Sequence, residues 1–442
     1  MNTHNAGRKS SLRHIAGVVQ PVVRLQGGNL RRVSLAISLI VLGVVATLLA
    51  GCGGGGDQGG GGGQTVTIVS DLPRQGSNRA QTTTMVNAIE MAIEERGGKA
   101  GNVNIDYEGY DDATAQAGQW DEAKCAENAQ TVAQDEDVVG WIGPFNSGCA
   151  SVQIPILNEA GLAMISPANT YIGLTKPGGE PDEPEKYYQT GERNYARVIV
   201  ADDEQGQAGA LLMEDEGVES VFILDDKETY GKGLADQVEK SAKELGIQIV
   251  GREGIDGSAA NYRSLMNKIA DVDPDAIYFG GIIENNAGQL LKDKVGAGMS
   301  NDGVLFIGPD GIFVDTLLSQ AGEAAEGAYI TFGGLPQSEL SAKGQQFVQD
   351  YESEYDDTVQ PYTAYAYEAA NVMLDAIEQA SKEGEVTRES VLEQVFATED
   401  YEGVLGRWSF DDDGDTSLTE LSVQQVQNGQ FEYQRTIDAG EM

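Results

Sequence analysis

Histidine is nearly absent from this 442-residue chain: the two histidines are His4 and His14, and none follows. Histidine is a common general base near neutral pH and the commonest metal ligand. Its absence after position 14 argues against serine–histidine or cysteine–histidine catalysis and against histidine-ligated zinc. We therefore expect a protein that is not an enzyme and that requires no metal or other cofactor.

Basic residues are scarce as well, with 29 lysines and arginines against 70 acidic residues and a formal charge of −41. Six of the 29 lie in the first 51 residues, which contain no aspartate or glutamate, so the rest of the chain is still more acidic. A surface of this sign repels phosphate backbones, which excludes nucleic-acid binding. Its self-repulsion is screened by salt, so we expect stability to rise with ionic strength.

The first 51 residues have the pattern of a secretory leader, in which a basic stretch precedes the apolar run "LAISLIVLGVVATLLA". This run has about 16 residues, fewer than the ~20 that a spanning helix needs. It ends in "LLAGC", and Leu49–Cys52 resembles a bacterial lipoprotein signal, in which the cysteine carries a diacylglycerol. An uncleaved anchor helix is the alternative. We predict a signal peptide over residues 1–51, lipidation of Cys52, and attachment to the outer face of the cytoplasmic membrane.

After Cys52 the chain consists mainly of glycine up to residue 64, with no apolar side chain to bury. A segment of this composition is a flexible linker. We expect residues 52–64 to tether a folded body that begins at residue 65.

From residue 65 onward, short β-branched runs alternate with amphipathic stretches, which predicts parallel sheets covered by helices on both faces. The proline- and glycine-rich segment 176–195 interrupts this rhythm and is expected on the surface. Two helices near 339–355 and 362–381 precede a hairpin that turns at Asn428-Gly429. The fold class is α/β with two Rossmann-like lobes. We expect one lobe to contain residues 65–201 and 334–418, and the other to contain 202–333 and 419–442.

Small polar residues follow several predicted strands, where open α/β sheets bind their ligands. In "WIGPFNSGC" no histidine is available to activate Ser147, but the start of the next helix suits a carboxylate. The alternative role for Ser147 is that of a helix N-cap. In "ISPANT" a strand is followed by Ala168, Asn169 and Thr170.

On the expected second lobe, Asp310 follows the strand of "FIGPDG" and could neutralise an ammonium group, or could be an ordinary turn residue. Tyr230 begins a helix in "DDKETYGKG", where it either packs in the core or covers an apolar ligand group. The acidic loop "DDDGD" at 411–415 lacks the EF-hand spacing, so we interpret it as a solvated turn. Cys125 and Cys149 are expected to form a disulfide in an oxidising compartment, with two free thiols as the alternative.

These motifs in this order resemble the type I periplasmic binding proteins of ABC importers, in the leucine/isoleucine/valine-binding branch. The resemblance covers nearly all of residues 65–437 and rests on these stretches: "YDD" at 110–112, "IGPFNSGC", "GLAMISPANT", "DDEQG", "DDKETYGKGLA", "IYFGG", "FIGPDG", "AEGAYIT" and "YTAYAYEAANVMLDAI". It implies two lobes joined by three crossovers around a ligand cleft.

The resemblance also implies site residues: Ser147, Ala168 and Thr170 as carboxylate and ammonium contacts, Tyr230 as a pocket aromatic, and Asp310 as the ammonium partner. The chain departs from the family where Ile282 replaces an aromatic residue, and where the first loop offers Gln75, Ser77 and Arg79 instead of one. Arg79 would favour a more acidic or polar ligand than leucine. The cysteine pair is shifted by about one helical turn from the family's disulfide positions.

The function that we expect is that of a lipid-anchored, monomeric substrate-binding protein. It would capture a branched-chain amino acid or similar zwitterion by lobe closure and deliver it to an ABC permease. The alternative is an extracellular sensory module on the same fold that binds amides, urea or small carboxylates. An amidase or other hydrolase is a more remote alternative.

Overall fold

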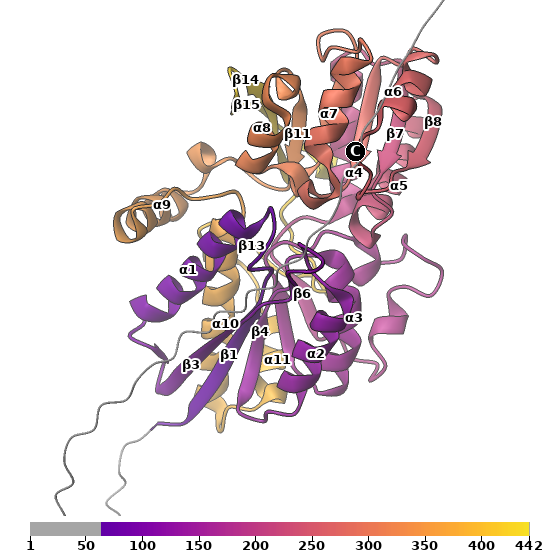
Figure 1. Ribbon diagram of the computed structural model, residues 1–442. Helices are drawn as coiled ribbons and strands as arrows, with labels where there is room; N and C mark the ends of the chain where they lie inside the picture. The colour runs from indigo at the N-terminus through magenta and orange to yellow at the C-terminus, as the bar shows by residue number, and fades with distance from the viewer. Residues whose placement is uncertain (1–62, 442) are drawn as a thin grey trace, which may run out of the picture. The chain divides into compact units, whose positions relative to one another are not determined.

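The computed structural model describes residues 63–441 and contains two large sheets and one two-stranded sheet (Figure 1). The predicted signal peptide, Cys52 and nearly all of the tether lie outside these residues. No helix within 63–441 has the length and apolarity needed to cross a membrane.

The first sheet has the strand order β2-β3-β1-β4-β5-β6 and is parallel apart from the short edge strand β2. All five residues of β4 are buried, as expected for a strand covered on both faces. In Figure 1, α1 and α10 lie on one side of this sheet and α2 and α3 on the other. The strands are β1 Thr65–Asp71, β2 Lys99–Ala100, β3 Val103–Tyr110, β4 Val138–Ile142, β5 Ala163–Ser166 and β6 Tyr195–Arg197. The helices from this part of the chain are α1 Arg79–Glu95, α2 Glu122–Ala133 and α3 Ser147–Glu159.

The second sheet has the order β15-β14-β11-β10-β9-β7-β8, with parallel strands from β11 to β8. Helices α4 and α5 pack on one face, and α6, α7 and α8 on the other. The strands are β7 Ser220–Asp225, β8 Gln248–Gly254, β9 Ala276–Gly280, β10 Leu305–Gly308, β11 Tyr329–Phe332, β14 Glu420–Gln427 and β15 Gln430–Asp438. The helices are α4 Asp202–Asp215, α5 Thr229–Glu244, α6 Arg263–Ala270, α7 Ala287–Gly296 and α8 Asp315–Ala321.

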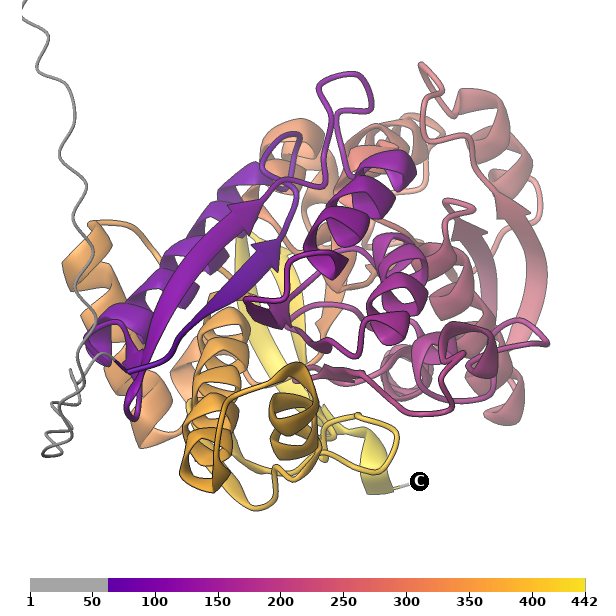
Figure 2. The same ribbon diagram turned by 90° about the horizontal axis from the view of Figure 1, so that it is seen from below.

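The chain passes between the two sheets three times. After β11 it returns to the first sheet as α9 Ala342–Tyr355, α10 Thr363–Glu383 and α11 Arg388–Phe396. Figure 2 shows α10 and α11 in gold near the indigo strands. The small sheet of β12 Tyr401–Gly403 and β13 Gly406–Trp408 follows. The chain then crosses back as the antiparallel hairpin β14–β15. Asn428 and Gly429 both have positive φ, 53° and 74°, which confirms the predicted hairpin turn.

The prediction that segment 176–195 is a surface excursion was wrong in part. Glu183, Tyr187 and Tyr188 are buried in it. The hydroxyls of Tyr171 and Tyr187 each donate to the Glu183 carboxylate at 2.6 Å. Proline and glycine content indicated a loop correctly, but composition does not reveal that a loop folds back over a carboxylate.

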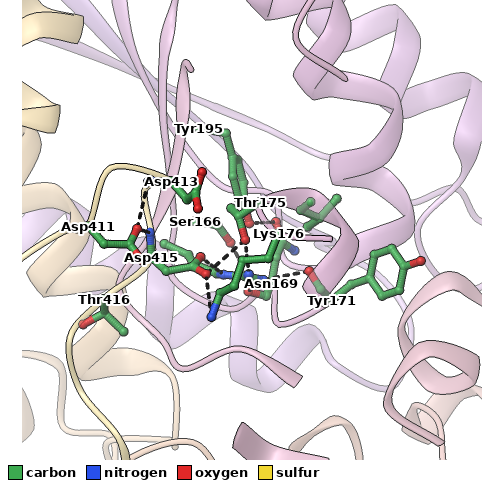
Figure 3. A network of polar contacts seen from close by, with 12 residues as sticks. Ser166, Asn169, Tyr171, Thr175, Lys176, Tyr195, Asp411, Asp413, Asp415 and Thr416 are labelled. Atoms are coloured by element: carbon green, nitrogen blue, oxygen red, sulfur yellow. Dashed lines mark hydrogen bonds and ion pairs between the residues drawn. The ribbon is translucent and has the colours of Figure 1, made fainter. Parts of the chain in front are cut away.

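The acidic loop 411–415 is also not a simple solvated turn, because Asp415 is only 4% exposed. Arg197, which is fully buried, donates from Nε to Asp415 Oδ1 at 2.6 Å, and Lys176 Nζ lies 3.1 Å from Asp415 Oδ2. Figure 3 shows Lys176, Thr175 and Asp415 directed toward one another. Arg197 also donates to the carbonyl of Tyr171 at 2.8 Å, so the same ion pair supports the segment that follows β5.

Candidate ligand-binding site

A small cavity lies where residues that follow strands of both sheets meet. Its volume is about 20 Å³, which is room for about one water molecule. A ligand the size of an amino acid therefore enters only if the two walls move apart. The lining residues are Phe145, Asn146, Ser147, Gly148, Ala168, Glu228, Tyr230, Ile282, Asp310, Gly311 and Tyr362.

The first wall of the cavity is the start of α3. Asn146 occupies the N-cap position with an extended backbone, so Ser147 is the first helical residue and not the N-cap. The Ser147 hydroxyl accepts from the backbone N–H of Tyr171 at 3.4 Å. A Cβ on Gly148 would lie 2.4 Å from the Trp120 ring, so this position requires glycine. The first turn of a helix presents free N–H groups and a positive dipole end, which favour a carboxylate.

The three residues predicted after β5 are placed differently from one another. Ala168 lines the cavity, whereas Asn169 and Thr170 do not. Asn169 donates to the carbonyl of Phe145 at 2.9 Å and accepts from the hydroxyl of Tyr195 at 3.1 Å. Asn169 therefore holds the loops that form the wall together, while Thr170 lies behind the wall and is fully buried.

The second wall contains Asp310, which is 4% exposed. Its Oδ1 accepts from the hydroxyl of Tyr230 at 2.7 Å, and its Oδ2 accepts from the hydroxyl of Tyr362. Burial raises the pKa of Asp310, and the two tyrosine hydrogen bonds oppose that rise. Tyr362, just before α10, was not predicted as a site residue. Its only sequence signal is an aromatic residue next to the helix start in the quoted "YTAYAYEA" stretch.

Glu228 is a second carboxylate in the lining that sequence reasoning missed. It lies just before α5 and accepts from Trp120 Nε1 at 3.1 Å and from Gln119 Nε2 at 3.2 Å. Asn285 Nδ2 also donates to it at 3.0 Å. Because Trp120 and Gln119 precede α2 of the first sheet, Glu228 joins the two walls at the edge of the cavity.

The first loop, predicted to contact the ligand, takes part in contacts between the walls instead. The carbonyl of Ser77 accepts from Thr316 Oγ1 at 3.1 Å, and Ser77 does not line the cavity. Asn78, which was not predicted, donates from its backbone N–H to Glu284 at 2.8 Å.

The other two residues of the first loop, Arg79 and Gln75, do not line the cavity either. Arg79 is the first residue of α1, its side chain is exposed, and it is not part of the lining, so this geometry gives no support to a ligand contact. Gln75 donates to Asp111 at 2.9 Å. Ile282 does line the cavity and supplies an apolar surface.

The charge of the lining is of one sign. Asp310 and Glu228 contribute carboxylates, and within the described chain no lysine or arginine lines the cavity. Opposite charges within a few ångströms stabilise each other most strongly where water is excluded. The second wall therefore favours a positively charged ligand group.

The two cysteines lie behind the first wall. Cys125 of α2 and Cys149 of α3 have their sulfur atoms 2.06 Å apart, which is bonding distance, and their Cα atoms 5.6 Å apart. Both side chains are fully buried. The pair connects the helix that begins at Ser147 to its neighbour.

Comparisons with known sequences point in the same direction as this geometry. The sequence model described as periplasmic binding protein matches residues 65–430. The leucine-, isoleucine-, valine-, threonine- and alanine-binding protein of Pseudomonas aeruginosa is 29% identical over 338 residues, which are 75% of this chain and 82% of that protein. A Leu/Ile/Val-binding protein homolog of Brucella suis is 29% identical over 280 residues, which are 63% of this chain and 69% of that protein.

Several solved structures share the fold. The leucine-binding protein LivK of Thermotoga maritima has a TM-score of 0.74 at 24% identity, covering 85% of this chain and 100% of its own. LivJ of Streptococcus pneumoniae in complex with isoleucine has a TM-score of 0.71 at 23% identity, covering 85% and 99%. A solute-binding protein of R. palustris in complex with benzoate has a TM-score of 0.68 at 18% identity, covering 84% and 96%. The predicted fold of two α/β lobes is confirmed.

Proposed function

The chain belongs to the periplasmic binding protein family, in the leucine/isoleucine/valine-binding branch, and from this premise we propose that it captures an amino acid for an ABC importer. The ligand is a branched-chain amino acid or a similar small zwitterion. It is held outside the cytoplasmic membrane and delivered to a permease.

The observation that carries this proposal is the opposite polarity of the two cavity walls. The start of α3 at Ser147 and Gly148 offers hydroxyl and N–H groups, while Asp310 offers a carboxylate on the facing wall. A zwitterion satisfies both walls at once, with its carboxylate at the helix start and its ammonium group at Asp310. Phe145 and Ile282 supply apolar surface for a side chain.

The same observation separates an amino acid from an aromatic acid. One structural neighbour binds benzoate, which has a carboxylate but no positive charge. In this chain Asp310 and Glu228 would face such a ligand without a cation between them. Burying unpaired charges is costly, so the lining supports an amine ligand over a simple carboxylate.

Closure of the lobes provides the mechanism of capture. Direct contacts between the walls at Glu228–Trp120 and Asn78–Glu284 stabilise the closed arrangement, and a ligand that bridges both walls adds to them. A ligand shifts the population toward closure only by its differential affinity for that state. The permease would then recognise the closed form.

The anchoring part of the proposal rests on the sequence. Cys52 is proposed as the lipidated residue, residues 1–51 as the cleaved signal peptide, and 52–64 as the tether. The Cys125–Cys149 pair is proposed as a disulfide in the oxidising extracytoplasmic space.

The test is a thermal-shift screen of the protein against the standard L-amino acids, amides, urea and small carboxylates, followed by calorimetry of each positive compound. We expect L-leucine or another apolar L-amino acid to raise the unfolding midpoint, because a ligand that binds only the native state stabilises it. Stabilisation by benzoate or urea, with none by any amino acid, would contradict the proposal.

A further inference from the structure

A group of buried polar atoms without partners lies behind the cavity wall, around the first turn of α4. Asp202 is completely buried, and neither oxygen of its carboxylate has a hydrogen-bond partner within residues 63–441. The same holds for Thr170 Oγ1, Gln205 Oε1 and the Tyr278 hydroxyl. We call these four residues the inner cluster. Native proteins leave few buried polar groups unsatisfied, so such a cluster points to a ligand.

The inner cluster adjoins the cavity. The backbone N–H of Asp202 donates to the carbonyl of Thr170 at 2.8 Å, and Thr170 is two residues beyond Ala168 of the cavity lining. Burial raises the pKa of Tyr230, another lining residue, and the charges of Asp310 and Asp202 raise it further. Tyr278 of the inner cluster is the strand partner of Ile307 in β10, and Asp310 follows three residues later. The inner cluster and Asp310 therefore lie at the same end of the second sheet.

These carboxylates lack a matching cation. Burial, followed by the charge of Asp310, raises the pKa of Asp202, and the nearby Thr170 hydroxyl opposes this rise. Burial raises the pKa of Asp310 as well. The other charged groups acting on Asp202 are Asp203 and Arg197, and Arg197 is committed to its ion pair with Asp415. When no cation lies between them, two neighbouring buried carboxylates oppose each other's ionisation. The remaining titratable groups around the pair are Tyr230, Tyr278 and Tyr362.

We propose that Asp202 is the second carboxylate of the amine-binding end of the site, and that Asp202 and Asp310 share a proton which the ligand's ammonium group displaces. This inference rests on the proposed function, because it assumes an amine ligand. An ammonium group has three N–H donors and one positive charge, which match the acceptor oxygens of the two carboxylates and Thr170. On binding, the carboxyl O–H bond breaks and the proton leaves to the buffer. The ammonium charge replaces it, so the charge of the site is unchanged.

The sign of the pH dependence follows from this exchange. Because binding releases a proton, the dissociation constant falls as the pH rises. The trend ends at the pH where the free protein has already lost the shared proton. A site whose two carboxylates were already ionised would show no such trend below neutral pH.

The first experiment needs no variant. The tightest-binding L-amino acid from the screen is titrated into the protein at about pH 6 in two buffers of different ionisation enthalpy. The difference in observed heat gives the number of protons released, and we expect a value approaching one per ligand. Equal observed heats in the two buffers would mean that no proton is released, and would overturn the inference of a shared proton.

The second experiment compares Asp202→Asn with Asp203→Asn. Asp203 is the next residue of α4 and pairs with Lys176 at 3.2 Å, so its variant controls for loss of one charge at this helix start. We expect Asp202→Asn to weaken binding more than tenfold and to release fewer protons, and Asp203→Asn to change affinity less than threefold.

The stability of the free variant separates a ligand role from a structural one. Because no cation of the described chain pairs with Asp202, Asp202→Asn breaks no ion pair and is expected to unfold at the same or a higher temperature than the parent. A structural carboxylate would instead give a lower midpoint.

The outcomes distinguish the two proposals. If the unmodified protein binds none of the standard L-amino acids, the proposed function fails. If it binds one, and Asp202→Asn binds it with parental affinity, only the present inference fails. If Asp202→Asn does not fold, the calorimetry of the unmodified protein decides the inference alone.

Discussion

Two buried aspartates near the segments that join the sheets, Asp415 and Asp202, have opposite surroundings. The Asp415 carboxylate lies 2.6 Å from Arg197 Nε and 3.1 Å from Lys176 Nζ, whereas the Asp202 carboxylate has no hydrogen-bond partner in the described part of the chain. Burial opposes ionisation of both residues. The two cations nevertheless hold the pKa of Asp415 below its ordinary value, while that of Asp202 is raised. A buried carboxylate that pairs with cations of the protein stabilises the fold. A buried carboxylate without such a cation, next to a cavity, is available to bind a ligand.

The largest effect on stability is expected from breaking the ion pair between Asp415 and Arg197. Asp415→Ala leaves the Arg197 guanidinium buried without its carboxylate, and loss of one partner of a buried pair typically costs about 3–5 kcal/mol of stability. Arg197 also supports the carbonyl of Tyr171 beyond the first wall, so ligand affinity should fall together with stability. The measurement is denaturant unfolding monitored by circular dichroism.

A matched control lies in the same loop. Asp413 pairs with Arg193 at 3.0 Å, but the two side chains are 45% and 25% exposed. Exposed pairs contribute about 0–1 kcal/mol, so Asp413→Ala should be nearly neutral. An equal loss from both substitutions would contradict the assignment of a structural role to Asp415 in particular.

The opposite pattern is expected on the ligand side. Asp310→Ala removes the proposed ammonium partner and should weaken amino-acid binding by more than tenfold in calorimetry. Stability should fall much less than in Asp415→Ala, because Asp310 makes no ion pair with the protein among the described residues. Asp302→Ala, an exposed position in the loop before β10, is the control. Unchanged affinity in Asp310→Ala would contradict the proposal that the ligand is a zwitterion held at Asp310.

A smaller effect is expected at Glu228, whose carboxylate joins the two walls of the cavity. Glu228→Gln replaces a charged acceptor of Trp120 and Gln119 by a neutral amide, and a change of this kind is worth about 0.5–1.5 kcal/mol. If that energy stabilises closure, affinity should fall about threefold to tenfold. Glu244→Gln, at the exposed far end of α5, should bind as the parent does. X-ray scattering with and without ligand would show whether the variant closes less completely.

The fold was predictable from the sequence because strands and helices are indicated by local patterns of residues. Runs such as "VVGWI" are apolar throughout, and a strand of that composition has to be covered on both faces. The positions of Ser147, Ala168 and Asp310 at strand ends were predictable for the same reason, since carboxyl ends of parallel strands share one edge of a sheet.

The residues that sequence reasoning missed depend on contacts between distant parts of the chain. Tyr362 reaches Asp310 across 52 positions, and Glu228 reaches Trp120 across 108. Neither residue carries a local motif that indicates its partner. Asp202 belongs to the quoted "DDEQG" stretch, but only the structure shows that its carboxylate is buried and unpaired.

The smallest effect is expected at Arg79, which the sequence singled out as a ligand contact. Its side chain is exposed at the start of α1 and does not line the cavity, in contrast to the buried Arg197. Arg79→Ala should therefore change amino-acid affinity less than twofold, and calorimetry at low and moderate ionic strength would detect any long-range contribution. If the variant instead lost affinity for acidic amino acids alone, Arg79 would reach the ligand when the walls move. The expectation that the ligand is an apolar amino acid would then have to be revised.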